Sequence, residues 1–184
     1  MKNSIKLLIV LLAVSCNLFG QKVITKNGNI RFYSETPVET IEAINTQVNS
    51  ALDISTGDFV FKVLIKAFEF KKALMQEHFN ENYMESDKLP NATFTGKISN
   101  LKDINFNKDG IYDAIVEGNL TIHGVTKKIS EKGSIEVKSG KFIAKAVFNV
   151  KPKDYNISIP GSVVANIAES IKVYVDVTLE KFAT

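Results

Sequence analysis

Apolar and polar residues alternate with a period of two along most of this chain. The clearest alternation covers residues 57–67, 111–122, 141–151 and 171–181. In the first of these segments Phe59, Phe61 and Val63 share one parity, whereas Lys62 and Lys66 have the other. Successive side chains of a β-strand point to opposite faces, so each segment predicts a strand with one buried face.

Weaker alternation elsewhere brings the expected number of strands to about eight. It occurs around Ile30 and Phe32, between Val48 and Ile54, at Phe94 and Ile98, and from Val125 to Val137. Residues that tolerate a positive φ interrupt the pattern at Asn107–Gly110, His123-Gly124, Lys132-Gly133 and Lys138–Gly140. Such short connections predict hairpins and therefore antiparallel pairing.

One segment follows a helical pattern. Residues 69–87 are rich in helix-forming side chains and place Phe70 and Leu74 at helical spacing. Pro90 disfavours helical geometry at the residue before it, so the predicted helix ends by that point. The pattern also allows a short helical turn over residues 36–44, where a proline suits the first helical position.

The predicted strands must bury their apolar faces against one another. They can do so by closing into a barrel or by splitting into two packed sheets, and alternation alone leaves both open. In residues 141–151 the inward set mixes large with small side chains: Phe142, Ala144, Ala146 and Phe148. Such a mixture leaves space inside, which favours an all-β, antiparallel barrel with a cavity and one short helix between strands.

The first 20 residues predict a secretory signal peptide. Lys2 and Lys6 give this segment a positive start, and an unbroken apolar run follows from Leu7 to Val14. The run is too short for a membrane-spanning helix, which needs about 18 apolar residues. We therefore expect a mature domain over residues 21–184, periplasmic or secreted, with no permanent membrane anchor.

Cys16 is the single cysteine and opens a second processing route, to a lipoprotein. The preceding Ala13–Ser15 make a poor lipoprotein box, so we expect cleavage before Gln21 instead. The mature domain then has no disulfide and must hold its fold by burial alone. Without Lys2 and Lys6, 21 basic side chains stand against 20 acidic ones, and this balance implies no nucleic-acid partner.

Catalytic motifs are sparse in the mature sequence. His78 and His123 are its two histidines, and neither lies in a complete catalytic or metal-binding pattern. We expect His123 at a tight turn and His78 on a polar helix surface. The glycines do not form a phosphate-binding loop, so no nucleotide cofactor and no bound metal are expected.

Two stretches form motifs that are familiar as a pair. The first, His78–Phe94, joins a histidine-bearing helix to a lysine, a proline and then a strand. The second, Gly118–Lys127, reads GNLTIHGVTK. In order and spacing both resemble the YceI-like family of exported bacterial proteins, over roughly residues 28–179. The resemblance implies a lipocalin-like barrel and, for characterised members, a polyisoprenoid or other long amphipathic lipid in the lumen.

Three functions are compatible with the sequence. The first is non-enzymatic binding or transport of a long isoprenoid or fatty amphipathic ligand, driven by burial of apolar surface. The second is an exported stress-related or interaction module with a filled core and no ligand. The third is a lumen-based enzyme that uses His78 or His123 with a nearby carboxylate. The sequence also leaves a homodimer open.

Lipid binding is the function that we expect, and strand parity selects the side chains that would contact the ligand. We name no catalytic residue. The expected ligand-binding residues are Phe59, Phe61, Val63, Phe94, Leu120, Ile122, Phe142, Phe148 and Val175.

Overall fold

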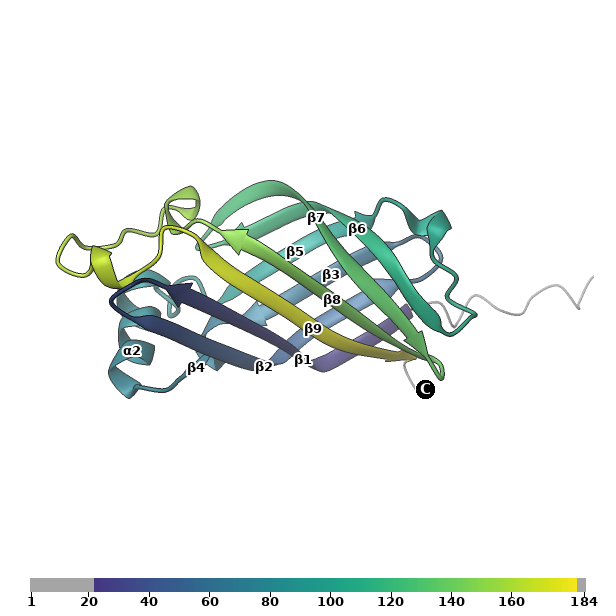
Figure 1. Cartoon of the computed structure of the whole chain (residues 1–184), viewed down its shortest axis with the longest axis horizontal. Helices are drawn as coiled ribbons and strands as arrows, with labels where there is room; N and C mark the ends of the chain where they lie inside the picture. Colours follow the sequence, from purple (N-terminus) through teal and green to yellow (C-terminus); the bar gives the residue numbers. More distant parts are fainter. Residues whose placement is uncertain (1–21, 182–184) are drawn as a thin grey trace, which may run out of the picture.

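In a computed structural model, residues 22–181 form a closed antiparallel β-barrel of eight strands with a two-residue strand added at its side (Figure 1). The expected signal peptide and Cys16 lie outside the described residues. The strands are β1 (Lys22–Glu35), β2 (Thr40–Asp53), β3 (Asp58–Leu64), β4 (Glu69–Phe70), β5 (Asn91–Ile98), β6 (Gly110–Ile122), β7 (Val125–Lys138), β8 (Lys141–Val150) and β9 (Ile171–Lys181).

Closure of the barrel comes from pairing of its first and last strands. The hydrogen-bonded order is β1-β9-β8-β7-β6-β5-β3-β2, and β2 pairs again with β1. The β1–β9 contact is antiparallel and includes the pair Ile30 and Val175. Every strand of this ring therefore has two neighbours, and the ring leaves no long unpaired edge. Of the two architectures that the alternation left open, the structure is therefore the barrel and not two packed sheets.

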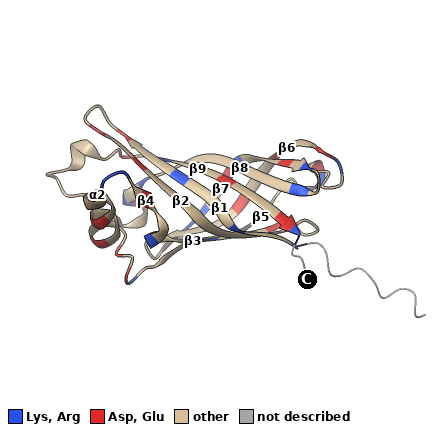
Figure 2. Cartoon of the chain, turned by 90° about the horizontal axis from the view of Figure 1, so that it is seen from below, with Lys and Arg blue, Asp and Glu red and all other residues tan. Residues whose placement is uncertain are grey.

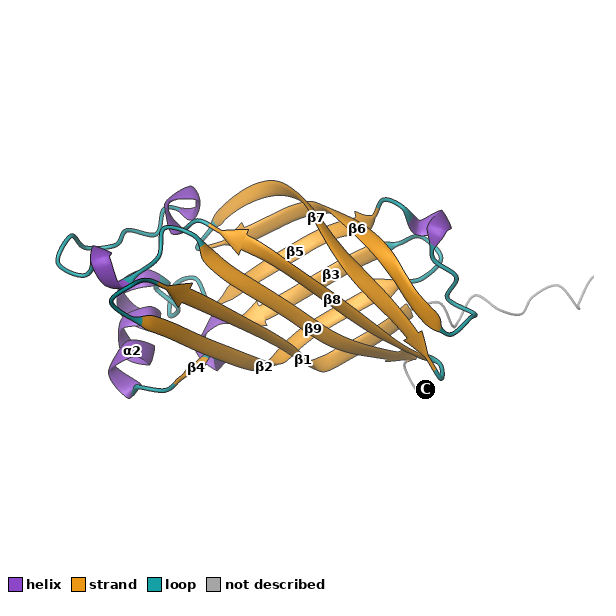
Figure 3. Cartoon of the chain, viewed as in Figure 1, coloured by secondary structure: helices purple, strands orange, loops and turns teal. Residues whose placement is uncertain are grey.

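The two ends of the barrel carry different connections (Figure 3). At one end lie α2 (Ala73–His78), a π-helical turn (Phe79–Tyr83) and the 3-10 turns at Pro152–Tyr155 and Val164–Asn166. We call this the helix end. At the other, the 3-10 turn Leu101–Asp103 follows β5; we call this the packed end, because buried side chains fill the barrel there.

The expected helix over residues 69–87 is present but shorter. Glu69 and Phe70 pair with Ile44 and Ala43 of β2 as β4, because Phe70 packs into an aromatic cluster instead of following the helix. Helical geometry starts at Ala73 and continues through the π turn to Tyr83.

The expected helical turn over residues 36–44 is wrong. Thr36 instead begins the connection between β1 and β2, and its hydroxyl oxygen accepts hydrogen bonds from the backbone N–H groups of Val38 and Glu39 at 3.2 and 3.0 Å. This side-chain turn satisfies the backbone locally, so β2 can begin at Thr40.

Two of the expected turns have the backbone that the sequence predicted. His123 and Gly124, with φ of 49° and 73°, join β6 to β7, and Ser139 and Gly140 join β7 to β8 in the same way. The expected turn at Lys132-Gly133 is wrong, because Gly133 lies inside the continuous strand β7. A side chain there would collide with the carbonyl oxygen of Lys145, so this glycine permits close approach of β8 rather than a turn.

The packed end holds the main hydrophobic core. Inward side chains from most strands meet the loop residues Leu101, Ile104 and Phe106 there. The core consists of Val23, Leu52, Phe59, Ile98, Ile104, Ala114, Ile135, Val137, Phe142, Ala144, Val177 and Leu179. This plug closes one end of the barrel, so any space for a ligand must lie toward the helix end.

Candidate functional site

Two adjoining cavities occupy the rest of the barrel interior. The inner cavity has a volume of about 110 Å³ and lies at mid-barrel, whereas the outer cavity has a volume of about 460 Å³ and lies at the helix end. Five side chains line both: Ile30, Val63, Ala92, Leu120 and Phe148. The outer cavity alone falls within the range of about 300 to 1,000 Å³ that is usual for sites of drug-sized ligands.

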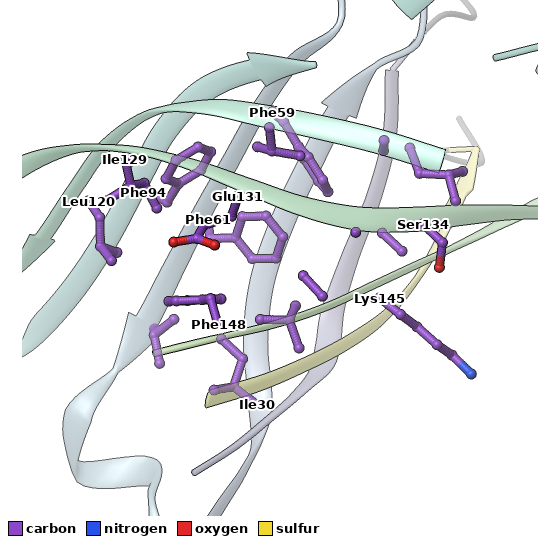
Figure 4. A pocket seen from close by; sticks show the side chains of 18 of the residues that line it. Ile30, Phe59, Phe61, Phe94, Leu120, Ile129, Glu131, Ser134, Lys145 and Phe148 are labelled. Carbon is purple, nitrogen blue, oxygen red and sulfur yellow. The ribbon is translucent and has the colours of Figure 1, made fainter. Parts of the chain in front are cut away.

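Phenylalanines make up much of the inner cavity (Figure 4). The rings of Phe59 and Phe61 lie 4.7 Å apart on β3, and that of Phe61 lies 6.3 Å from Phe94 on β5. Figure 4 shows Phe148 on the opposite side of the same space. The wall is thus almost entirely apolar and is suited to hydrocarbon.

A second aromatic cluster covers the outer cavity. Phe79, in the π-helical turn, lies 5.6 Å from Phe32, 5.7 Å from Phe68 and 5.0 Å from Phe70, measured between ring centroids. These rings tie the helical segment to β1 and β4. The helical segment is therefore an apolar cover over the mouth of the barrel.

The rim of the outer cavity is polar. Lys72 and Asn166 donate hydrogen bonds to the Glu39 carboxylate at 3.0 and 3.3 Å. Both bonds lower the pKa of Glu39, and the bond from Lys72 has the larger effect. The backbone N–H of Ala168 donates to the buried hydroxyl of Ser34 at 2.8 Å. The rim thus joins the β1–β2 connection to α2 and to the segment before β9.

The structure places eight of the nine sequence-predicted ligand-binding residues on a cavity wall. Phe59, Phe61, Phe94 and Val175 line the inner cavity, Ile122 the outer one, and Val63, Leu120 and Phe148 both. Contact with a ligand stays a prediction for all of them. Strand parity was sufficient to find these positions, because every inward residue of a half-filled barrel lies either in the core or on the cavity wall.

Phe142 is the exception. Its side chain is 2% exposed, and its ring packs 5.8 Å from that of Phe106 in the packed end. It lines neither cavity. Parity identifies Phe142 as inward but does not say how far along the barrel axis the loop after β5 fills the interior.

A pair of facing glycines lies under the Phe94 ring, which lines the inner cavity. Gly96 on β5 and Gly118 on β6 are register partners, and the tip of the Phe94 ring lies over both. A Cβ atom on Gly118 would be 2.5 Å from the Cα of Gly96 and 2.8 Å from the Phe94 ring. The two strands therefore approach more closely than side chains would allow, and the ring covers the bare backbone.

Several residues on the cavity walls are outside the predicted set, and Glu131 is the acidic one of the inner cavity. It lies on β7 opposite Val116, and Figure 4 shows its carboxyl oxygens inside the inner cavity next to Phe61. Burial in these apolar surroundings raises its pKa. Its parity matches that of Ile129 and Ile135, so a charged residue in the apolar register was the signal available in the sequence.

The two histidines have different positions. His78 lines the outer cavity from α2 and is exposed, whereas His123, at the β6–β7 turn, is bound on both sides. Its Nδ1 lies 3.2 Å from the carbonyl oxygen of Tyr155, and its Nε2 lies 3.2 Å from a carboxylate oxygen of Glu85. Both partners are acceptors, so both contacts are hydrogen bonds only when the two ring nitrogens carry protons.

His123 therefore acts as a link between three connections at the helix end. Lys88 also contacts Glu85 at 2.6 Å. Lys88 and His123 both lower the pKa of the Glu85 carboxyl, and Lys88 has the larger effect. Within residues 22–181 no group of three or more His, Cys, Asp or Glu side chains could hold a metal ion. No helix in this range is long and apolar enough to cross a membrane.

Comparison with known proteins settles the family. The model of the YceI-like domain matches residues 22–179. The chain belongs to the YceI-like domain family. This match includes all eight strands of the ring except the last two residues of β9, and it confirms the resemblance noted in the two sequence motifs. Among curated protein sequences, none matches this chain.

Several solved structures resemble the chain at low sequence identity. A polyisoprenoid binding domain from Saccharophagus degradans, implicated in plant cell wall breakdown, has a TM-score of 0.76 at 11% identity, covering 88% of this chain and 98% of that one. Burkholderia cenocepacia BcnA has a TM-score of 0.64 at 13% identity, covering 85% and 96%. The Campylobacter jejuni YCEI protein has a TM-score of 0.56 at 17% identity, covering 75% and 81%. These likenesses establish the fold.

Proposed function

We propose that this protein binds or transports a polyisoprenoid or another long amphipathic lipid in its lumen, without catalysis. The observation that carries the proposal is the pair of adjoining apolar cavities, which runs from mid-barrel to the helix end. Membership of the YceI-like family and the likeness to a polyisoprenoid binding domain support it. Transfer of the hydrocarbon chain from water would be favourable by about 25 cal/mol per Å² of apolar surface buried.

The proposed place of action is the periplasm or the extracellular space. Its support is the basic and then apolar N-terminal sequence, which lies outside the described residues. The surface of the described part has no dominant charge: basic and acidic residues are mixed along the strands and at both ends in Figure 2. Such a mixed surface suits a protein that recognises the hydrocarbon chain of its ligand and not a charged group.

The two alternative functions have less support. A module with a filled core does not fit an outer cavity of about 460 Å³. A lumen-based enzyme would need an acid and a base near the reacting group. His123 is bound to Glu85 and Tyr155 at the mouth, and His78 lines the outer cavity without a side-chain hydrogen bond or ion pair among the described residues.

The experiment that tests lipid binding uses a plug in the lumen. Ala92 is 9% exposed and lines both cavities, so an Ala92→Phe ring would fill their junction. We expect native mass spectrometry of the delipidated wild-type protein to show a one-to-one complex after addition of farnesol, and the variant to show none. Ala146→Leu, which fills only the inner cavity, gives a milder plug.

Thr95→Leu is the matched control. Thr95 is on the same strand as Ala92 and is exposed on the outer face, so this substitution should leave the complex intact. Circular dichroism would show that the variants are folded. If the wild-type protein takes up no farnesol, or if the folded plugged variants bind it as well as the control does, lumenal lipid binding is wrong.

A further inference from the structure

A single carboxyl group interrupts the apolar wall of the inner cavity. Glu131 has the same parity on β7 as the inward residues Ile129 and Ile135. Figure 4 shows its oxygens surrounded by the rings of Phe61, Phe94 and Phe148. The strand register therefore directs this side chain into the lumen and not toward solvent outside the barrel.

The described part of the chain gives this carboxyl no partner. No hydrogen bond or ion pair to Glu131 exists within residues 22–181, and burial is the one cause that shifts its pKa. Lys145 lies on the same wall, but Figure 4 shows its ammonium group pointing away, and it pairs with Asp176 outside at 3.6 Å. Tyr155 does not serve as a partner either, because both groups are acids: burial first, then Asp154 and then Glu131 raise the pKa of Tyr155. Glu131 is half-buried, and a carboxyl group held against apolar side chains without a partner is costly, so Glu131 calls for a partner from outside the chain.

The size of the inner cavity limits what that partner can be. At about 110 Å³ it is smaller than the roughly 300 Å³ at which sites for whole drug-sized ligands begin. The cavity adjoins the larger outer one, and five lining residues are common to both. It can therefore hold the end of a long molecule whose remaining length fills the outer cavity.

We propose that Glu131 anchors the ligand by its inner end and selects a lipid with a terminal hydroxyl group, a long-chain alcohol, over its phosphate ester or a plain hydrocarbon. This inference rests on the proposed lipid binding and adds the end group and the direction of insertion. The hydroxyl donates to or accepts from the carboxyl in either of its protonation states. A phosphate would bring a second acidic group into the same apolar space, and a hydrocarbon would leave the carboxyl unpaired.

Three probes of one chain length test the proposal: farnesol, farnesyl phosphate and farnesene. Isothermal titration calorimetry at neutral pH would compare their affinities for the wild-type protein, for Glu131→Leu and for Glu131→Gln. We expect the wild-type protein to bind farnesol about tenfold more tightly than the other two, as one satisfied hydrogen bond would give. Glu131→Leu should lose this preference by weaker binding of farnesol and tighter binding of farnesene.

Glu131→Gln keeps a hydrogen-bonding group of nearly the same shape without acidity. It should bind farnesol within about threefold of the wild-type affinity, because its amide can pair with the hydroxyl. This variant also tests the role of the carboxyl group if Glu131→Leu does not fold. Glu117→Leu on the neighbouring strand is the matched control, since Glu117 is exposed on the outside and should not affect any probe.

The outcomes separate this inference from the proposed function. Binding of all three probes with equal affinity by the wild-type protein and by Glu131→Leu would overturn the anchor and leave lumenal binding intact. A wild-type preference for farnesyl phosphate would do the same and would place the head group elsewhere. Failure of the wild-type protein to bind any probe would overturn the proposed function itself.

Discussion

At the scale of single residues, the close packing of β5 against β6 depends on two glycines, which have no side chain. Gly96 and Gly118 face one another across β5 and β6, and the Phe94 ring covers them. The space that two side chains would occupy is used for close strand approach and for an aromatic wall. The alternation over residues 111–122 predicts a strand that contains Gly118, but the partner strand and the covering ring depend on register, which the sequence alone did not give.

Gly118→Ala tests this packing. The added Cβ would lie 2.5 Å from the carbonyl oxygen of Thr95 and 2.5 Å from the Cα of Gly96, so backbone must move. We expect a loss of about 1–3 kcal/mol in the free energy of unfolding, measured by urea denaturation. Gly161→Ala is the control, because a Cβ there meets nothing within 4 Å and should change stability by less than about 1 kcal/mol. Equal effects at the two positions would show that the close approach is not a constraint.

Glu131 makes stability depend on pH in a predictable direction. Burial raises its pKa in the folded state above the ordinary value of 4.5, so the native state holds the proton more strongly than the unfolded chain does. Stability should therefore fall as pH rises from 4.5 through the raised pKa and then level off. Glu131→Gln should lack this slope.

Urea unfolding of the wild-type protein and of Glu131→Gln at pH 4 and pH 8 measures the effect. We expect the variant to gain stability relative to the wild type on going from the lower to the higher pH. A constant difference between the two proteins would mean that the carboxyl is hydrated in the folded state.

At the scale of elements, the sequence predicted the strands better than their connections. The expected segments 111–122 and 171–181 agree with β6 and β9 within one residue at each end, because alternation reports directly on a half-buried sheet. The helix began later than expected and residues 36–44 were not helical, because their backbone is held by contacts distant in sequence or by the Thr36 hydroxyl. Local propensity does not contain such contacts.

The cover at the helix end is held by His123 from the β6–β7 turn. It bridges Glu85, which follows the π-helical turn, to Tyr155. We expect His123→Gln to open this end locally: hydrogen–deuterium exchange should rise in residues 79–90 and 152–157 while the strands keep their protection. His78→Gln is the comparison, since His78 makes no such bridge, and it should leave exchange near wild type. Unchanged exchange in His123→Gln would show that the aromatic cluster of Phe79 is sufficient to hold the cover.

At the scale of the whole molecule, the barrel has one filled half and one hollow half. The sequence predicted the closed sheet and the inward faces, and the motifs of the YceI-like family predicted the fold. It did not predict where along the axis the filling stops. That boundary depends on the loop that carries Leu101, Ile104 and Phe106 into the interior, and these residues have no alternating pattern.

A hollow half implies that stability depends on the ligand. A ligand that binds the folded barrel and not the unfolded chain should stabilise it by about 2.7 kcal/mol at a free concentration 100 times its Kd. We expect farnesol to raise the Tm of the delipidated protein by several degrees in differential scanning calorimetry, and Ala92→Phe to show no such shift. A Tm that is independent of farnesol concentration in the wild-type protein would contradict a lumenal site.

The pairing of β1 with β9 also sets the order in which the molecule can be made. These are the first and last strands of the described residues, so the pairing of Ile30 with its register partner Val175 must wait until nearly the whole sequence is available. Until then an emerging chain would have two open sheet edges and an exposed apolar interior, the state in which β proteins aggregate most readily. Contacts of such long sequence separation also slow folding. Ring closure thus protects the finished barrel, while the nascent chain depends on rapid completion or on a chaperone.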